Sequence, residues 1–529
     1  MKNQFKTILT AAALVAGLSS CEKFLDTTPD NRATVDSEEK VVALLGSAYS
    51  DHDYLLINEL YSDNVDNYSV QFKNTSIFYD AIYNWTDIVE SNNESTENIW
   101  GTFYGNIASA NQAIIAIEEL GGPEVSDVLS QAYGEAYLCR AFAHFILVNT
   151  FCLQYNKNTS SKDLGLPYMT EPETTLVPQY ERGNVADVYS KIDADIQMGL
   201  KYVGDDNYSV PKYHFNKAAA YAFAARFYLF YEKYDKVIEY ADACLGSAPA
   251  TMLRDYDVLG TMPNGSPQQH PTTLHYVDPS VNANLLLLTA YSVMGQVFGG
   301  YSTANMYSHG AYIAKNEDCQ AAQPWGSSAY KDPPSVYSGS LDKVIFWRLP
   351  RIFQYTDPVA GIGFNRTVYP AFTTDECLLN RAEAYVHLGQ YDKACDDLNL
   401  WATNCATAPA AMTPESITAF YAAIPYWTWD KSTVKKKINP VFGSVEEGSV
   451  EESMYQCILA AKRVETLGLG LRWWDVKRFG IEIQRRKMNM SGVPEELIDT
   501  MPVDDPRRAI QIPARVINAG IKANPRNSK

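Results

Sequence analysis

The sequence predicts an all-α protein, a helical-repeat body interrupted by long irregular insertions that contain short strands. Two observations predict this class. Apolar residues recur at three- and four-residue steps over several long stretches, and residues 232–237 closely match residues 389–394. Between the helical stretches lie segments rich in Gly, Pro, Ser, Asn and Tyr. One helix pair cannot bury its apolar face alone, so we expect several pairs to stack.

The expected helices follow one another in pairs. In chain order they cover residues 98–120, 125–151, 185–203, 215–231, 234–245, 374–388 and 391–404. Gly121-Gly122-Pro123 ends the first helix, and Gly389 separates the last two. The matching corners share Tyr-Asp-Lys, and each follows a helix rich in Ala and Tyr. This layout resembles tetratricopeptide repeats, with other material inserted between the copies.

The chain is expected to form one unit, residues 21–529, behind a cleaved leader. Its parts are an N-terminal tether and first loop region (21–97), helical pairs (98–247), an irregular insertion (248–370), and further helices with a C-terminal motif (371–529). Loop regions as long as the insertion are uncommon in compact proteins and more often carry function. We therefore expect the insertion to form part of a ligand site.

The N-terminus has the pattern of an exported, lipid-anchored protein. Lys2 and Lys6 precede a short apolar stretch, and residues 1–20 read as a signal peptide. Leu18-Ser19-Ser20-Cys21 resembles a lipobox, in which the chain is cut before the cysteine and the Cys21 thioether carries the lipid. No later stretch reaches the length of a membrane-spanning helix, so we expect anchoring rather than spanning.

Composition and motifs exclude several functions. A net charge of -18 argues against a nucleic-acid partner, because the phosphate backbone repels such a surface. The sequence contains no G-x-S-x-G, H-E-x-x-H or P-loop motif, so we expect no enzyme, no cofactor and no catalytic metal. Without a CxxC pair, the cysteines after Cys21 are expected to be buried thiols, and His144 a core residue.

Rings and carboxylates in the loops are the candidate ligand residues. Aromatic rings stack on the C–H faces of sugars, and amides or carboxylates bind the hydroxyl groups. Two loop regions, residues 63–97 and 248–370, are expected to meet beyond the repeats. The predicted ligand-binding residues are Asp63, Asp66, Trp85, Tyr301, Tyr307 and Trp325. We expect Trp85 and Trp325 to be exposed rings. The Asp63 loop leaves plain turn chemistry or a calcium ion open as alternatives.

Three segments resemble the SusD/RagB-like family of outer-membrane nutrient-binding lipoproteins. They are residues 21–26 (Cys-Glu-Lys-Phe-Leu-Asp) with Pro29, the helix pair containing Trp100 and Arg140, and residues 462–465 followed by 470–480. The last segment contains Arg472-Trp473-Trp474-Asp475, similar to the family's Arg-Trp-Phe-Asp signature. Trp100, Trp473 and Trp474 lie on these helical motifs and are expected in the core.

This resemblance implies both a fold and a function. It implies about four tetratricopeptide-like helix pairs, and a lipid-anchored protein at the outer membrane, exposed on the cell surface. Such proteins bind a polysaccharide or oligosaccharide, partner a SusC-like TonB-dependent transporter and are not enzymes; some RagB-like members take peptides. Two rivals stay open on the residues alone. A helical glycoside hydrolase needs two suitably spaced carboxylates, and a pure tetratricopeptide scaffold binds peptides in its groove without a long insertion.

Overall fold

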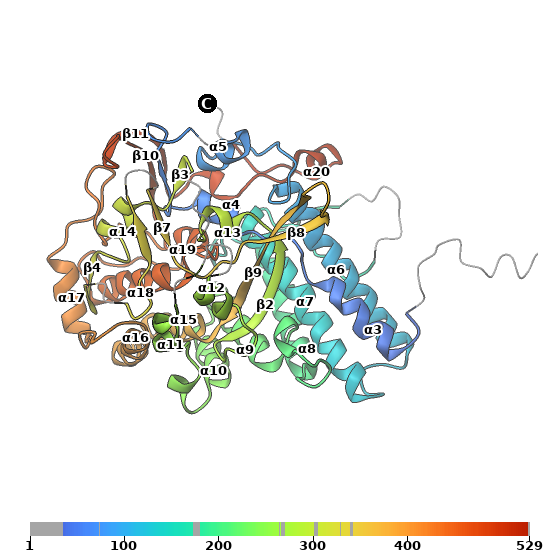
Figure 1. Cartoon of the computed structure of the whole chain (residues 1–529). Coiled ribbons are helices and arrows are strands. Elements are labelled where there is room, and N and C mark those ends of the chain that lie inside the picture. Colours follow the sequence, from blue (N-terminus) through green and yellow to red (C-terminus); the bar gives the residue numbers. More distant parts are fainter. Residues whose placement is uncertain are drawn as a thin grey trace, which may run out of the picture.

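The computed structural model describes residues 35–526, apart from residues 74, 173–179, 264, 266–269, 301–304, 328–329 and 339–341. Its body is a stack of antiparallel helix pairs, which runs in Figure 1 from α6, α7 and α8 at the right to α16 at the lower left. The pairs are built from α6 (Thr96–Glu119), α7 (Asp127–Phe151), α8 (Val185–Tyr202), α9 (Lys217–Phe230), α10 (Tyr234–Leu245), α15 (Thr374–His387) and α16 (Tyr391–Cys405). All seven helices predicted from periodicity are confirmed.

Side-chain caps explain where five of these seven helices begin, all except α10 and α16. At the start of each of the five, a side-chain oxygen accepts a backbone N–H that has no partner within the helix. The capping residues are Ser95, Ser126, Asn184, Asn216 and Thr373. Because these caps lie in extended backbone, each of the five helices has a sharp start.

The repeated corner predicted from the sequence is confirmed in the backbone. Gly389 has a φ of 67°, and Glu232 at the matching position has a φ of 57°. Glycine adopts this left-handed conformation freely, whereas a glutamate is strained in it. The two hairpins α9–α10 and α15–α16 therefore turn in the same way, although only one has the favourable residue.

An arginine on one helix binds a carboxylate on a neighbouring helix at three places in the stack. Arg140 on α7 donates to Asp195 on α8 at 2.7 and 2.6 Å. Arg381 on α15 makes the same pair of contacts with Asp397 on α16, at 2.9 and 2.6 Å. In the third, Arg226 on α9 binds Glu376 on α15. Such two-point contacts fix how adjacent helices face each other.

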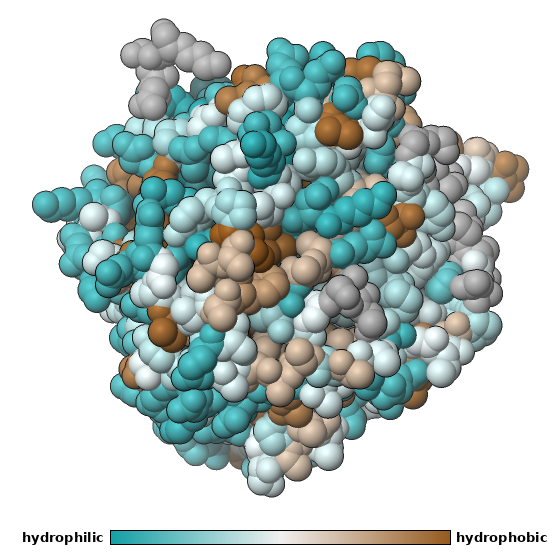
Figure 2. All heavy atoms as spheres, turned by 90° about the vertical axis from the view of Figure 1, so that its left-hand side faces the viewer, coloured by the Kyte–Doolittle hydropathy of each residue, from teal (hydrophilic) through white to brown (hydrophobic). Residues whose placement is uncertain are grey.

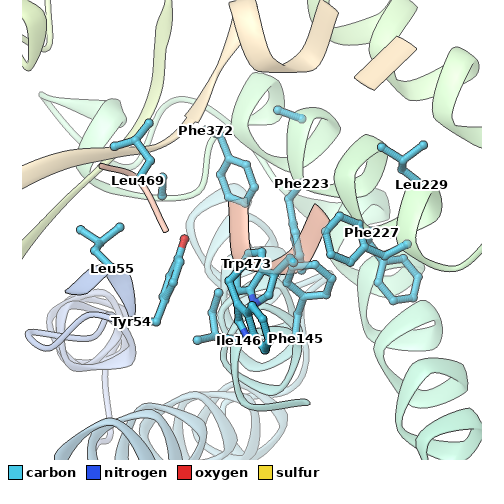
Figure 3. Packing of buried hydrophobic residues seen from close by; sticks show 14 of the residues in the cluster. Tyr54, Leu55, Phe145, Ile146, Phe223, Phe227, Leu229, Phe372, Leu469 and Trp473 are labelled. Carbon is cyan, nitrogen blue, oxygen red and sulfur yellow. The ribbon is translucent and has the colours of Figure 1, made fainter. Parts of the chain in front are cut away.

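The C-terminal motif lies at the centre of the core. Its helix α19 (Arg472–Arg478) packs against α4 (Leu55–Tyr61), near the start of the described chain. The ring of Trp474 stacks on Tyr54 at 4.9 Å and meets Phe145 edge-on at 5.7 Å. Figure 3 shows Trp473 among the phenylalanines of α7 and α9. Trp473, Trp474 and Trp100 are at most 8% exposed, which confirms them as core.

Further helices surround this stack. Before it come α3 (Glu38–Leu45), η1 (Gly46–Ala48) and α5 (Ile77–Tyr83), and after it α17 (Pro414–Ala422), α18 (Val450–Thr466) and α20 (Ala514–Asn518). Short helices in the loops are η2 (Pro211–Tyr213), η3 (Pro249–Thr251), α11 (Tyr256–Thr261), α12 (Pro271–Tyr276), α13 (Met294–Val297), α14 (Ala311–Asn316) and η4 (Pro506–Arg508). In the described part of the chain no helix is long and apolar enough to cross a membrane.

The expectation of an all-α class needs correction, because two sheets extend beyond short loop strands. One has the order β2 (Asn284–Tyr291), β9 (Ile362–Thr373), β8 (Ile352–Asp357), all antiparallel. The other has the order β11 (Pro494–Met501), β10 (Ile483–Met488), β1 (Asp66–Asn67), β3 (Tyr307–Ser308). Two small hairpins, β4–β5 (Ala322–Gln323, Gly326–Ser327) and β6–β7 (Ser335–Tyr337, Lys343–Ile345), complete the strands. The second sheet joins segments far apart in the sequence, which helical periodicity does not reveal.

Candidate functional site

The two loop regions expected to meet do so at a short antiparallel bridge. Asp66 of β1 pairs with Ser308 of β3. Beside it, the rings of Tyr83 and Tyr307 stack at 4.2 Å, and the Tyr307 hydroxyl donates to Asp80 at 2.6 Å. The first loop region and the insertion are thus in direct contact, and this part of the prediction is confirmed.

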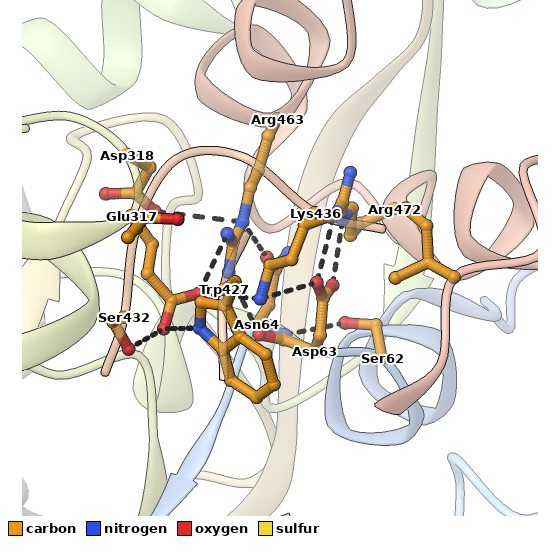
Figure 4. A network of polar contacts seen from close by, with 12 residues as sticks. Ser62, Asp63, Asn64, Glu317, Asp318, Trp427, Ser432, Lys436, Arg463 and Arg472 are labelled. Atoms are coloured by element: carbon orange, nitrogen blue, oxygen red, sulfur yellow. Dashed lines mark hydrogen bonds and ion pairs between the residues drawn. The ribbon is translucent and has the colours of Figure 1, made fainter. Parts of the chain in front are cut away.

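Below this bridge lies a network of buried charges, which we call the buried junction (Figure 4). Asp63 accepts from Arg472 at 2.8 and 2.9 Å, and Asp66 accepts from Arg486 at 2.8 and 3.0 Å. At its centre, the carboxylate of Glu317 binds cations from three different segments. The cations are Lys436 at 3.0 Å, Arg463 at 3.2 Å and Arg486 at 2.7 Å.

The junction holds its carboxylates ionised. Burial alone would raise the pKa of Glu317, but the charges of Lys436, Arg486 and Arg463 outweigh it and hold the pKa well below its usual range. Asp63 behaves in the same way, because Arg472 and Arg463 outweigh its burial. A buried charge of this kind is tolerated only while its partners remain in place.

The junction leaves no room for a sugar. Its cavity measures about 10 Å³, far too little to hold a sugar ring. The carboxylates of Asp63 and Asp66 are both bound by arginines, and their contact with a ligand stays an untested prediction. In the lysine run at 435–437, Lys435 and Lys436 are buried and only Lys437 is exposed.

The expected ring platforms are also buried. Trp85 is 2% exposed, and its indole N–H donates to the carbonyl of Tyr61 at 3.1 Å. Trp325 is 2% exposed and packs edge-on against Trp401 at 5.0 Å, while Tyr307 is 5% exposed. Exposure was predicted for Trp85 and Trp325 from their loop positions, and the structure shows this to be wrong at both rings. Their contact with a ligand stays an untested prediction.

Two predicted residues lie outside the described part of the chain, namely Cys21 and Tyr301. His144 is confirmed as a core residue: its ring nitrogens contact the Arg140 carbonyl and the Met169 amide at 2.8 and 3.1 Å. Burial lowers its pKa to about 3, so the ring is neutral. The eight cysteines that the structure describes are buried free thiols, as expected.

Exposed rings do occur in the insertion, on the hairpin of β8 and β9. Tyr355 is 57% exposed and Phe364 is 45% exposed. Phe353 and Tyr355 share one face, with ring centres 4.9 Å apart. A Cβ added at Gly363, opposite Tyr355, would come within 2.1 Å of the Gln354 carbonyl oxygen and 2.9 Å of the Phe353 ring, so glycine is needed for the close approach of the two strands and leaves room for this ring.

The other face of the hairpin has a second pair of rings. Tyr291 of β2 and Phe364 of β9 lie 5.6 Å apart, and the Arg366 guanidinium lies 3.9 Å from the centre of the Tyr291 ring. Amide side chains alternate with these rings along both strands: Gln354 is exposed and Asn365 is half-buried. We call Tyr291, Phe353, Tyr355 and Phe364 the hairpin cluster.

A further partly exposed indole lies elsewhere in the insertion. The ring of Trp347 stacks on His270 at 3.7 Å, and its N–H donates to the Ser335 hydroxyl at 3.2 Å. Tyr337, on the same face of β6 as Ser335, is 43% exposed. Burial lowers the pKa of His270, so the stacked pair is uncharged at neutral pH. Trp347 is therefore held in one orientation with part of its surface open.

These rings can provide flat apolar surfaces beside hydrogen-bonding groups, which is what a sugar ring requires. These rings were missed because we looked for tryptophan and tyrosine in segments rich in Gly and Ser, and these rings lie on or near strands instead. A usable signal was the alternation of residues 352–357, Ile-Phe-Gln-Tyr-Thr-Asp, followed by Gly361 and Gly363. Within the described residues, no group of three or more His, Cys, Asp or Glu side chains is placed to hold a metal ion.

Comparisons with known proteins agree with the fold. Residues 23–229 match the family model SusD-like_3, described as starch-binding associating with outer membrane. No curated protein matches the sequence. Solved structures with the same fold include a SusD superfamily protein from Bacteroides thetaiotaomicron, with a TM-score of 0.60 and 17% identity over 93% of this chain and 100% of that one.

Two further structures are similar over nearly their whole length. A SusD superfamily protein from Bacteroides fragilis has a TM-score of 0.60 and 18% identity, covering 91% of this chain and 98% of that one. A SusD-like carbohydrate binding protein from Bacteroides vulgatus has a TM-score of 0.59 and 14% identity, covering 91% and 96%. The sequence match to the SusD-like family model is thus confined to the N-terminal part, residues 23–229, whereas the fold of the SusD superfamily structures is shared over nearly all of the chain.

Proposed function

We propose that this protein is a cell-surface lipoprotein that captures a polysaccharide or oligosaccharide and delivers it to a TonB-dependent outer-membrane transporter. The observation that carries glycan capture is the open rings of the insertion, Tyr355, Phe364 and Trp347, which lie beside amide and hydroxyl groups. A related structure from Bacteroides vulgatus is that of a carbohydrate binding protein, which supports the same ligand class. The family description, with its association to the outer membrane, supports the location.

Anchoring and delivery form the second part of the proposal. Lipid attachment at Cys21 would keep the protein on the membrane, and a transporter partner would receive the ligand. Intact mass of membrane-extracted protein tests the first, and a Cys21→Ala variant that still partitions with membranes would contradict it. Purification of the native complex from outer membranes tests the second, since a TonB-dependent transporter should be recovered with it.

A glycan array on the mature protein, followed by calorimetry with the best ligand, tests binding. Removing an open ring deletes a large contact, so we expect Tyr355→Ala and Trp347→Ala each to weaken binding by about 1 to 3 kcal/mol, roughly five- to two-hundred-fold. The matched control is Tyr213→Ala, which removes a tyrosine that is 37% exposed outside the insertion and should bind as the parent does.

Two outcomes would redirect the proposal. If the protein binds peptides and no glycan, the RagB-like alternative replaces the glycan. Bound oligosaccharide should also be recovered unchanged after overnight incubation, because binding alone is expected. New products on chromatography would favour the hydrolase alternative.

A further inference from the structure

An apolar groove lies between α6, α20 and the segment that follows α7. It has a volume of about 480 Å³. The lining residues are mainly aromatic and aliphatic, with polar groups from Asn111, Glu171 and Arg515. Figure 1 places α6 and α20 on the side of the molecule that also carries α3. A groove of this size and character is large enough to hold several apolar side chains.

The walls of the groove are held in place by contacts behind them. The Tyr104 hydroxyl donates to the Pro167 carbonyl at 2.8 Å, and the Asn111 amide donates to the Met169 carbonyl at 3.2 Å. Trp100 meets Phe151 edge-on at 5.2 Å. Because these side chains are held by contacts behind the walls, the groove stays open and its walls do not pack against each other.

We propose that the N-terminal segment of this chain, residues 22–34, lies in this groove with Phe24 and Leu25 as its apolar anchors. Phe24 and Leu25 are the two large apolar residues of the segment, and they are adjacent. Charged residues flank them, with Lys23 before and Asp26 after. Glu171 and Arg515 in the groove lining offer opposite charges to these two. The proposal does not depend on what the protein binds elsewhere.

The length of the segment fits the position of the groove. Val35 packs against the core just before α3, and Glu38 at the start of α3 accepts from Ser126 at 2.6 Å, which places this point beside the C-terminal end of α6. From Glu119 back to Asn111 the helix rises about 12 Å. An extended chain from Val35 back to Leu25 spans up to roughly 33–36 Å, so Leu25 reaches well into the groove.

A polarity-sensitive dye on the segment tests this docking in a chain that begins at Glu22. The described cysteines are buried, so Thr27→Cys supplies the reactive thiol without removing either anchor. We expect the dye to emit at shorter wavelength than on the denatured chain. Ala108→Arg places a charge in the groove at an exposed position and should shift the emission to the red. Gln112→Arg, exposed on the same helix and outside the lining, is the matched control and should leave the emission unchanged.

Trypsin cleavage after Arg32 provides a second readout. Losing the burial of an anchor should make cleavage at least about tenfold faster in Phe24→Ala than in the parent. Equal cleavage rates in Phe24→Ala and the parent, or an emission wavelength that does not change in Ala108→Arg, would overturn the proposal. An emission shift that grows with protein concentration would also overturn it, because the groove would then be occupied by a second copy of the chain. Thermal melting of each variant confirms that the body remains folded.

Discussion

The buried junction and the hairpin cluster use the same kinds of side chain with opposite results. In the junction the rings of Tyr312 and Trp427 lie over Arg486, at 5.1 and 5.3 Å, and the arginine is also bound by two carboxylates. In the hairpin cluster Arg366 lies over Tyr291, at 3.9 Å, and the neighbouring rings remain open to solvent.

The difference comes from where the partners lie in the sequence. The partners of Glu317 are Lys436, Arg463 and Arg486, all more than a hundred residues further along the chain. Segments converging from such distances cover one another, and their loops become buried. β9 pairs with β2 as far as Arg366, and beyond that residue the tip of the β8–β9 hairpin pairs only between its own two strands. The tip therefore projects, and its rings have little to cover them. A loop is therefore exposed when its contacts are local.

Breaking the junction should give the largest effect. Glu317→Ala leaves three buried cations without their shared partner, so we expect the free energy of unfolding to fall by about 3 to 5 kcal/mol. The matched control is Glu447→Ala, whose pair with Lys437 has both side chains about 60% exposed; it should cost at most about 1 kcal/mol. Urea denaturation measures both. Equal losses would mean that the junction contributes no more than a surface pair.

A buried ring and an exposed ring, both in the insertion, separate the effect of burial from that of exposure. Trp325→Ala removes a buried indole and should cost about 3 to 5 kcal/mol of stability. Tyr355→Ala removes an exposed ring and should change stability by no more than about 0.5 kcal/mol. Thermal and chemical denaturation of the two variants decide. If Tyr355→Ala unfolds as easily as Trp325→Ala, the hairpin cluster is structural and cannot be treated as an open site.

Acid should lower the stability of the buried junction and leave the hairpin cluster unaffected. Asp318 lies at the edge of the junction, 2.8 Å from His309 and 4.0 Å from Arg463. Burial would raise the pKa of Asp318, but the charges of His309 and Arg463 outweigh it and lower the pKa to about 2. A lowered folded pKa gives stability that is present above the unfolded value and is lost as the pH falls. We therefore expect the parent to lose stability between about pH 4 and pH 2. Asp318→Asn should lose less over that range; an identical pH profile would contradict the assignment.

Much of the fold followed from local pattern, whereas the site did not. The helices α10 and α16 begin at Tyr234 and Tyr391 as predicted, because their signal is periodic and lies within the segment. Asp63 is buried in an ion pair with Arg472, which lies more than four hundred residues away, and no local sequence pattern predicts such a partner. Trp85 was expected to be exposed because it lies in a loop. Its indole can be buried because its N–H donates to the carbonyl of Tyr61, a partner that the loop position does not reveal.

The stacking of Trp474 on Tyr54 has a consequence for the order in which the protein folds. The helix pairs from α6 to α10 join neighbours in the sequence and can form from local segments. The core around Tyr54 also needs a segment about 420 residues later in the chain, and closing a loop of that length is slow. A chain ending before residue 470 should therefore contain paired helices and an incomplete central core. Completion of the core is a late event, coupled to the arrival of the C-terminal motif.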